Sequence, residues 1–67
     1  MKLKKFIECE ITHDKMRERA ECYINPEHVA YIEEDEEYKG YSYIGLVSGA
    51  TTIVKGTLEE VKKHLRG

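Results

Sequence analysis

The stretch TTIVKGTLEEVKKHLRG, residues 51–67, changes from a strand pattern to a helix pattern at Thr57. Thr57 is a good N-cap residue, and Glu60, three positions later, completes the capping-box signature of a helix start. The apolar residues that follow at helical spacing form one stripe: Leu58, Val61 and Leu65. This pattern predicts a C-terminal helix that covers one face of a sheet.

Before residue 51 apolar residues recur at every second position, which is typical of half-buried strands. The alternation predicts five strands: Phe6–Ile11, Ala20–Ile24, His28–Glu33, Tyr41–Val47 and Thr51–Lys55. Proline predicts a turn at Asn25-Pro26-Glu27, because it pre-sets the turn backbone and cannot donate to a ladder. The expected fold class is α+β: about five short antiparallel β-strands with one C-terminal α-helix packed on the sheet, in a single domain of residues 1–67.

The apolar pattern also predicts how the strands pair. In the first hairpin one register puts every apolar side chain on one face. Its pairs are Ile11–Ala20, Cys9–Cys22 and Ile7–Ile24. The connection lacks an Asn-Gly or Asp-Gly signal, so we expect a disordered or bulged tip. Across the later Ser48-Gly49-Ala50 turn, Leu46 is expected beside Ile53. The helix stripe is expected on the face that carries Ile44, Leu46 and Ile53.

Size and charge restrict the function classes. A chain of 67 residues with 40% hydrophobic residues has a small core, which favours a homodimer. The net charge of −2 makes nucleic acid an unfavoured partner and gives no attraction to anionic lipid. The sequence has no signal peptide and no membrane-spanning run, so we expect a cytoplasmic protein with reduced cysteines.

Residues with reactive side chains form no recognisable catalytic or metal-binding motif. The three histidines, His13, His28 and His64, are far apart in the sequence, and no C-x-x-C or phosphate-binding glycine loop occurs. We therefore expect no enzyme, no metal and no cofactor. Cys9 and Cys22 remain a candidate redox pair, with two small core residues as the alternative.

Tyrosines and acids supply the candidate interaction residues. Tyr31, Tyr38, Tyr41 and Tyr43 cluster around the third and fourth strands. They could seal a dimer, since tyrosine is enriched in interface cores, or stack on bases. Residues 33–37 hold five of the thirteen acids and predict an acidic tip for a basic partner. Its candidate contact residues are Glu34, Asp35 and Glu36.

The run YINPEHVAYIEE, residues 23–34, begins a set of motifs that resembles the small FlbD/SwrD-like flagellar proteins. The other motifs are the Ser48-Gly49 turn, IVK at 53–55 and LEEV at 58–61. That family has an I-N-P step into a strand, a glycine hairpin and a V-K-x-(S/T)-x-E-E-V junction between strand and helix. Similar short proteins occur in bacteriophages. The resemblance implies a small non-catalytic accessory protein of bacterial or phage origin, without catalytic residues.

A second set of residues is similar to the first half of the LytTR DNA-binding domain. Residues 29–33, VAYIE, precede a tyrosine-bearing strand, and GTLEEV follows at 56–61. This likeness implies strands followed by a helix. It also keeps open a small nucleic-acid-binding regulator, for which the candidate contacts are Lys2, Lys4, Lys5, Arg17 and Arg19. The favoured hypothesis is a self-associating, non-catalytic interaction protein whose partner the sequence does not identify.

Overall fold

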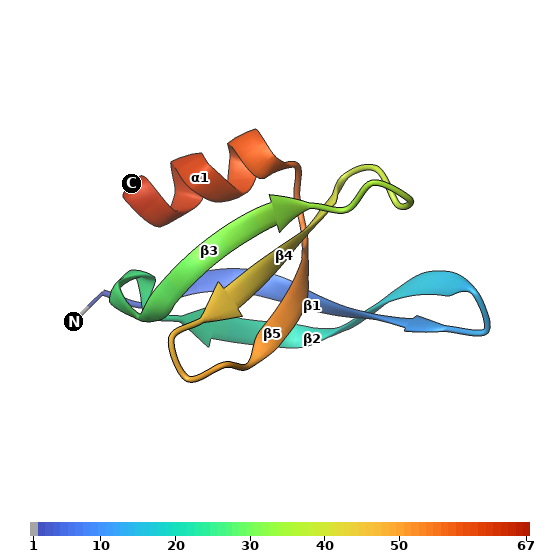
Figure 1. Cartoon of the computed structure of the whole chain (residues 1–67), viewed down its shortest axis with the longest axis horizontal. Helices are drawn as coiled ribbons and strands as arrows, with labels where there is room; N and C mark the ends of the chain where they lie inside the picture. Colours follow the sequence, from blue (N-terminus) through green and yellow to red (C-terminus); the bar gives the residue numbers. More distant parts are fainter. Residues whose placement is uncertain (1) are drawn as a thin grey trace.

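A computed structural model describes residues 2–67 and shows one five-stranded antiparallel sheet with one C-terminal helix (Figure 1). The strands are β1 (Lys4–Thr12), β2 (Lys15–Ile24), β3 (Val29–Glu34), β4 (Tyr41–Leu46) and β5 (Thr51–Lys55). A short 3-10 turn, η1 (Pro26–His28), precedes β3, and α1 (Leu58–Arg66) ends the chain. The strand order is β2-β1-β5-β4-β3. The predicted fold class is therefore confirmed.

The core lies between the sheet and α1. It consists of five buried side chains: Phe6, Ile24, Ile44, Val54 and Val61. The predicted capping box is present, because the Thr57 hydroxyl accepts from the Glu60 N–H and the Glu60 carboxylate accepts from the Thr57 N–H. With nine residues, α1 is too short to cross a membrane, and the described residues contain no other helix that could.

The β1–β2 hairpin differs from the predicted register. Cys22 lies opposite Phe6, three residues earlier in β1 than the expected Cys9. The tip is a tight turn in which His13 and Asp14 both have positive φ, of 52° and 60°, and pairing extends to Thr12 and Lys15. The tip is therefore a tight turn, neither disordered nor bulged as expected, and the hairpin projects beyond the other strands (Figure 1).

Because of this register, the apolar residues expected to share one face of the hairpin lie on opposite faces, those of β1 on one and those of β2 on the other. Successive side chains of a strand alternate between faces, so Cys22 and Ile24 point with Phe6 toward α1. Ile7 and Cys9 therefore point to the other face. A register shift between Glu8 and Cys9 leaves Arg19 of β2 without a partner in the ladder, as in a β-bulge.

The second expected register is also wrong. Ile53 pairs with Tyr43 and Cys9 rather than with Leu46, so its side chain lies on the face away from α1. Ile44 and Leu46 do pack on the core, as expected. In β3 a register shift at Ala30 places Val29 and Ile32 together against the core, whereas strict two-residue alternation would put them on opposite faces.

Candidate interaction surfaces

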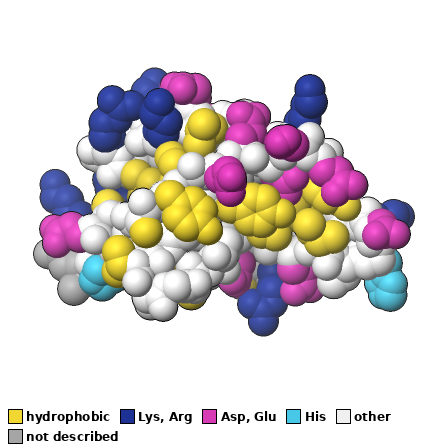
Figure 2. All heavy atoms as spheres, in the orientation of Figure 1, with side chains coloured by type: hydrophobic (Ala, Val, Ile, Leu, Met, Phe, Trp, Pro, Cys, Tyr) yellow, Lys and Arg dark blue, Asp and Glu magenta, His cyan; other side chains and the backbone are white. Residues whose placement is uncertain are grey.

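The face of the sheet that α1 leaves uncovered carries most of the predicted tyrosines. We call it the tyrosine face and define it by Tyr31, Tyr41, Tyr43, Ile53, Ile7 and Cys9. Directly opposed pairs make one row across four strands: Glu33–Tyr43, Tyr43–Ile53 and Ile53–Cys9. Figure 2 shows hydrophobic side chains that reach the surface in a band across the middle of the molecule, with acidic side chains beside it.

Tyr31 lies flat over Gly45, its cross-strand neighbour. A Cβ on Gly45 would come within 2.1 Å of the Tyr31 ring, so the absence of a side chain at Gly45 makes room for the ring. The ring buries Gly45, yet Tyr31 itself keeps 51% of its surface exposed. The tyrosine face therefore presents an aromatic side chain held against the sheet rather than a mobile one.

An ion pair covers part of this face. Lys55 donates to the Glu18 carboxylate at 2.8 Å, and Glu18 lies opposite the buried Cys9. The carboxylate raises the pKa of Lys55, mainly through this hydrogen bond. Burial is the main cause that raises the pKa of both cysteines, and nearby glutamates add to it. Both thiols therefore remain protonated at neutral pH.

The acidic run does not form a uniformly exposed tip. Asp35 is buried, with 5% of its surface exposed, and its Oδ1 accepts from the N–H groups of Glu37 and Tyr38 at 2.9 and 3.0 Å. Its own N–H donates to the Tyr41 carbonyl at 3.0 Å. Asp35 therefore stabilises the loop that connects β3 and β4. The exposed position expected for it in an acidic tip is wrong. Glu34 and Glu36 are exposed, as expected.

Asp35 also links the acidic loop to the tyrosine face. Within residues 2–67 its Oδ2 has no hydrogen bond of good geometry, but the carboxylate lies close enough to the Tyr43 hydroxyl to act on it. The pKa of Tyr43 is raised, first by desolvation and then by Asp35. The fourth predicted tyrosine, Tyr38, lies apart from the others and donates its hydroxyl to the Asp14 carbonyl at 3.1 Å.

We expect alkaline pH to destabilise the fold in part through Tyr43. Its folded pKa lies above the unfolded value of about 10, so its stabilising contribution is complete below pH ~10 and is lost as the pH rises through the folded pKa. Urea unfolding between about pH 8.5 and 11.5 should show that the free energy of unfolding falls less with rising pH for Tyr43→Phe than for the wild type. Tyr38, whose pKa is also raised, remains in both proteins. Equal losses would contradict the assignment.

The other candidate residues are not brought together. Cys9 and Cys22 are free thiols on opposite faces of the hairpin, so the register removes the geometry expected for a disulfide. His13, His28 and His64 lie on the hairpin tip, on η1 and on α1. Across residues 2–67, no group of three or more metal-ligating side chains is assembled.

The predicted nucleic-acid contacts are partly neutralised within the hairpin. Arg19 contacts the carboxylates of Glu8 and Glu10 at 3.1 and 3.5 Å, and Lys5 lies 3.6 Å from Glu21. These pairs are exposed and individually weak, but they place a negative charge beside each of these two cations. The hairpin therefore presents mixed charge rather than a basic stripe.

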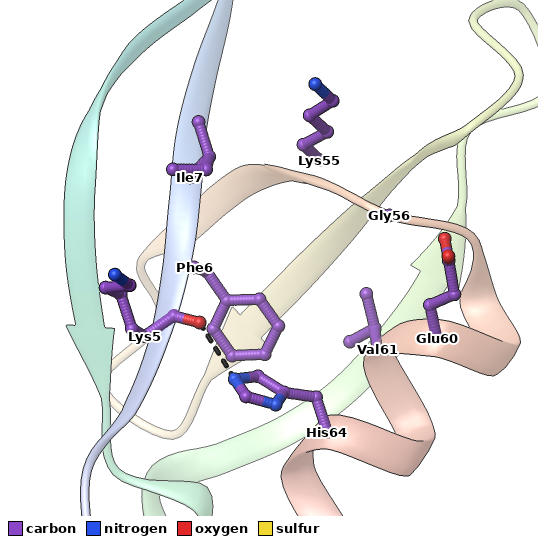
Figure 3. A pocket seen from close by; sticks show the side chains of 8 residues that line it. All are labelled: Lys5, Phe6, Ile7, Lys55, Gly56, Glu60, Val61 and His64. Carbon is purple, nitrogen blue, oxygen red and sulfur yellow. Dashed lines mark hydrogen bonds between the residues drawn. The ribbon is translucent and has the colours of Figure 1, made fainter.

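A groove between β1 and α1 is a feature that the sequence did not predict. β1 and β5 pair only at Glu8–Val54 and Cys9–Ile53 and then diverge. A hollow of about 330 Å³ lies at this end of the sheet, with Phe6 and Val61 among its lining residues (Figure 3). A second hollow adjoins it, since both are lined by Glu60 and His64, and adds Lys4 and Lys63. We call the two hollows together the basic groove.

His64 joins the two sides of the basic groove. Its ring stands edge-on to Phe6, with centroids 4.9 Å apart and an interplanar angle of 82°. Its Nε2 lies 2.9 Å from the Lys5 carbonyl oxygen (Figure 3), so Nε2 must carry the proton because a carbonyl can only accept. The contact fixes the distance between α1 and β1 and leaves the hollows on either side of it.

Comparisons of the chain with family models, with curated proteins and with solved structures find no match. The motif residues behind the FlbD/SwrD-like resemblance have structural roles in this fold. Asn25 caps η1 by accepting from the Glu27 N–H at 2.9 Å, and Thr57 with Glu60 caps α1. These residues therefore specify turns and helix starts rather than a binding site.

Proposed function

We propose that this protein is a small, non-catalytic, cytoplasmic interaction protein that self-associates through its tyrosine face. The observation that carries the proposal is the uncovered side of the sheet, where Tyr31, Tyr41 and Tyr43 share a face with Ile53. Tyrosines held on a flat sheet lose little conformational entropy on binding, and they are enriched in interface cores.

The size of the surface supports this proposal. A compact protein of this mass has a solvent-accessible surface of about 4,400 Å². This chain has 4839 Å², so it exposes more surface than a compact monomer of its mass. A standard interface buries about 800 Å² on each partner, roughly one sixth of that surface. A second copy placed on the tyrosine face by two-fold symmetry would cover its aromatic side chains with their own counterparts.

The resemblance to FlbD/SwrD-like proteins is retained as part of this proposal. It gives a bacterial or phage origin and an accessory role without catalytic residues. The turn and cap positions that carry the resemblance are present in the fold. The nucleic-acid alternative has less support, because Arg19 and Lys5 are engaged with glutamates of the same hairpin.

We expect Tyr43→Lys to convert the dimer to a monomer. Lysine would place a charge in the centre of the tyrosine face, where two-fold contact would bring two like charges together. Light scattering after size-exclusion chromatography should give about twice 7.8 kDa for the wild type and about 7.8 kDa for the variant.

The matched control is Val47→Lys, in the β4–β5 turn, where the side chain is 66% exposed. It should remain dimeric, and circular dichroism should show that both variants are folded. A wild-type protein that is monomeric at 100 µM, or a Tyr43→Lys protein that stays dimeric, would contradict an interface on this face.

A further inference from the structure

The basic groove combines an apolar hollow with unpaired positive charge. Phe6 and Val61 are buried core residues whose edges line the hollow, and Gly56 contributes no side chain to fill it. Lys4 and Lys63 line the adjoining hollow, and within residues 2–67 neither takes part in an ion pair. The apolar part and the charged part therefore lie next to each other.

The volume restricts what the hollow can hold. Sites for small molecules usually enclose at least about 300 Å³ and bury most of the ligand. This hollow has about 330 Å³ and continues into its neighbour, so it suits one side chain of a longer ligand. The part of β1 that precedes Glu8 has no strand beside it on this side, which leaves room for such a ligand to run along the sheet.

The charges favour an acidic ligand. Lysines line both hollows, but Lys5 and Lys55 are paired with Glu21 and Glu18, which leaves Lys4 and Lys63 as the lining lysines outside any ion pair of residues 2–67. Glu60 is the only acidic side chain among the lining residues that are described, and its carboxylate accepts from the Thr57 N–H at 2.8 Å. Lys4 and Lys63 thus give the groove unpaired positive charge on a chain whose net charge is −2. Opposite charge on a partner would speed association and suppress basic competitors.

We propose that the basic groove binds an extended acidic peptide segment of a partner protein. One bulky apolar side chain of the peptide occupies the hollow beside Phe6 and Val61, and its flanking carboxylates contact Lys4 and Lys63. This binding goes beyond the proposed self-association. It uses the edge of β1 and α1 rather than the tyrosine face, so either activity can fail without the other.

The test uses a fluorescein-labelled peptide with one leucine between two pairs of glutamates, followed by fluorescence anisotropy. Replacing its leucine with alanine should weaken binding at least fivefold, because the hollow would lose the apolar side chain that fills it. A peptide with lysines in place of the glutamates should not bind. In NMR titrations with the parent peptide the largest shifts should fall on the amides of Phe6, Gly56 and His64.

Two neighbouring lysines of α1 provide matched variants of the protein. Lys63→Glu reverses a charge that lines the groove, whereas Lys62→Glu reverses one outside it, where Lys62 lies 3.5 Å from Glu59. We expect Lys63→Glu to weaken binding at least fivefold and Lys62→Glu less than twofold. The monomeric Tyr43→Lys variant should bind as the wild type does.

Three results would overturn the proposal. The first is no binding of the leucine peptide at millimolar concentration. The second is equal weakening by Lys63→Glu and Lys62→Glu, which would indicate attraction by net charge alone. The third is a set of NMR shifts centred on the tyrosine face, which would place the peptide on the other side of the sheet.

Discussion

Replacing Ile44 with alanine is expected to lower the free energy of unfolding by about 2–5 kcal/mol. Ile44 is fully buried and lies in β4, opposite Ile32 on one side and Thr52 on the other. The truncation removes apolar contacts at the centre of the core and leaves a cavity that the strands on both sides prevent from closing. A domain of this length has about 3–10 kcal/mol in total, so much of the population would unfold.

The matched control for this prediction is Ile11→Ala, near the hairpin tip, where the isoleucine is 40% exposed. It should cost less than Ile44→Ala, about 1 kcal/mol, because 40% of the Ile11 surface stays in contact with water in the folded protein. Urea titrations followed by circular dichroism would give both values. A loss below about 1 kcal/mol for Ile44→Ala would show that the core lies elsewhere.

The architecture could be predicted because its signals are local. Two-residue alternation continues until Thr57, where the capping box begins, and each pattern is typical of one kind of element. Pro26 marked the turn that separates the first hairpin from β3. Because such signals depend on nearest neighbours, they are not changed by how distant segments meet.

Strand register was predicted less well, because it depends on turns and bulges that carry weak signals. His13 and Asp14 form a two-residue turn with positive φ, a conformation that glycine and asparagine usually mark. Histidine and aspartate are also enriched in this conformation, so the His13-Asp14 pair is itself a weak signal for a tight turn. Register shifts at Arg19 and Ala30 left no comparable trace in the sequence.

Among the candidate site residues, the tyrosine face was the most predictable. Tyr41, Tyr43 and Gly45 alternate in one strand, so they had to share a face. Which face the helix covers depends on packing and could not be known. Asp35 was misplaced because its neighbours are all acidic and exposed, although an aspartate that caps its own loop is a known turn device.

The basic groove could not be predicted because its two sides come from opposite ends of the chain. Lys4 and Lys63 are 59 positions apart in the sequence, and only the divergence of β1 from β5 opens the space between them. No periodicity records where two strands stop pairing. Such a surface can be recognised only in the folded structure, where β1 and α1 lie next to each other.

The second large effect is expected from Phe6→Ala, which should lower the free energy of unfolding by about 3–5 kcal/mol. Phe6 is buried against the core and contacts His64, and its neighbour Lys5 accepts the His64 hydrogen bond. β1 is otherwise joined to β5 by two residue pairs, so Phe6 of β1 and Ile24 of β2 are the buried side chains that attach the β1–β2 hairpin to the core. Phe6→Leu, which keeps an apolar side chain there, should cost only about 1 kcal/mol.

Because β1 pairs with β5 at two positions, we expect Phe6→Ala to raise local unfolding of the β1–β2 hairpin before that of the other strands. In hydrogen exchange, amides of β2 should lose protection before those of β4, because β4 keeps both of its strand neighbours. Phe6→Leu should preserve the wild-type order of protection. If Phe6→Ala lowers protection equally in β2 and β4, the sheet unfolds as one unit and the hairpin is held by more than this side chain.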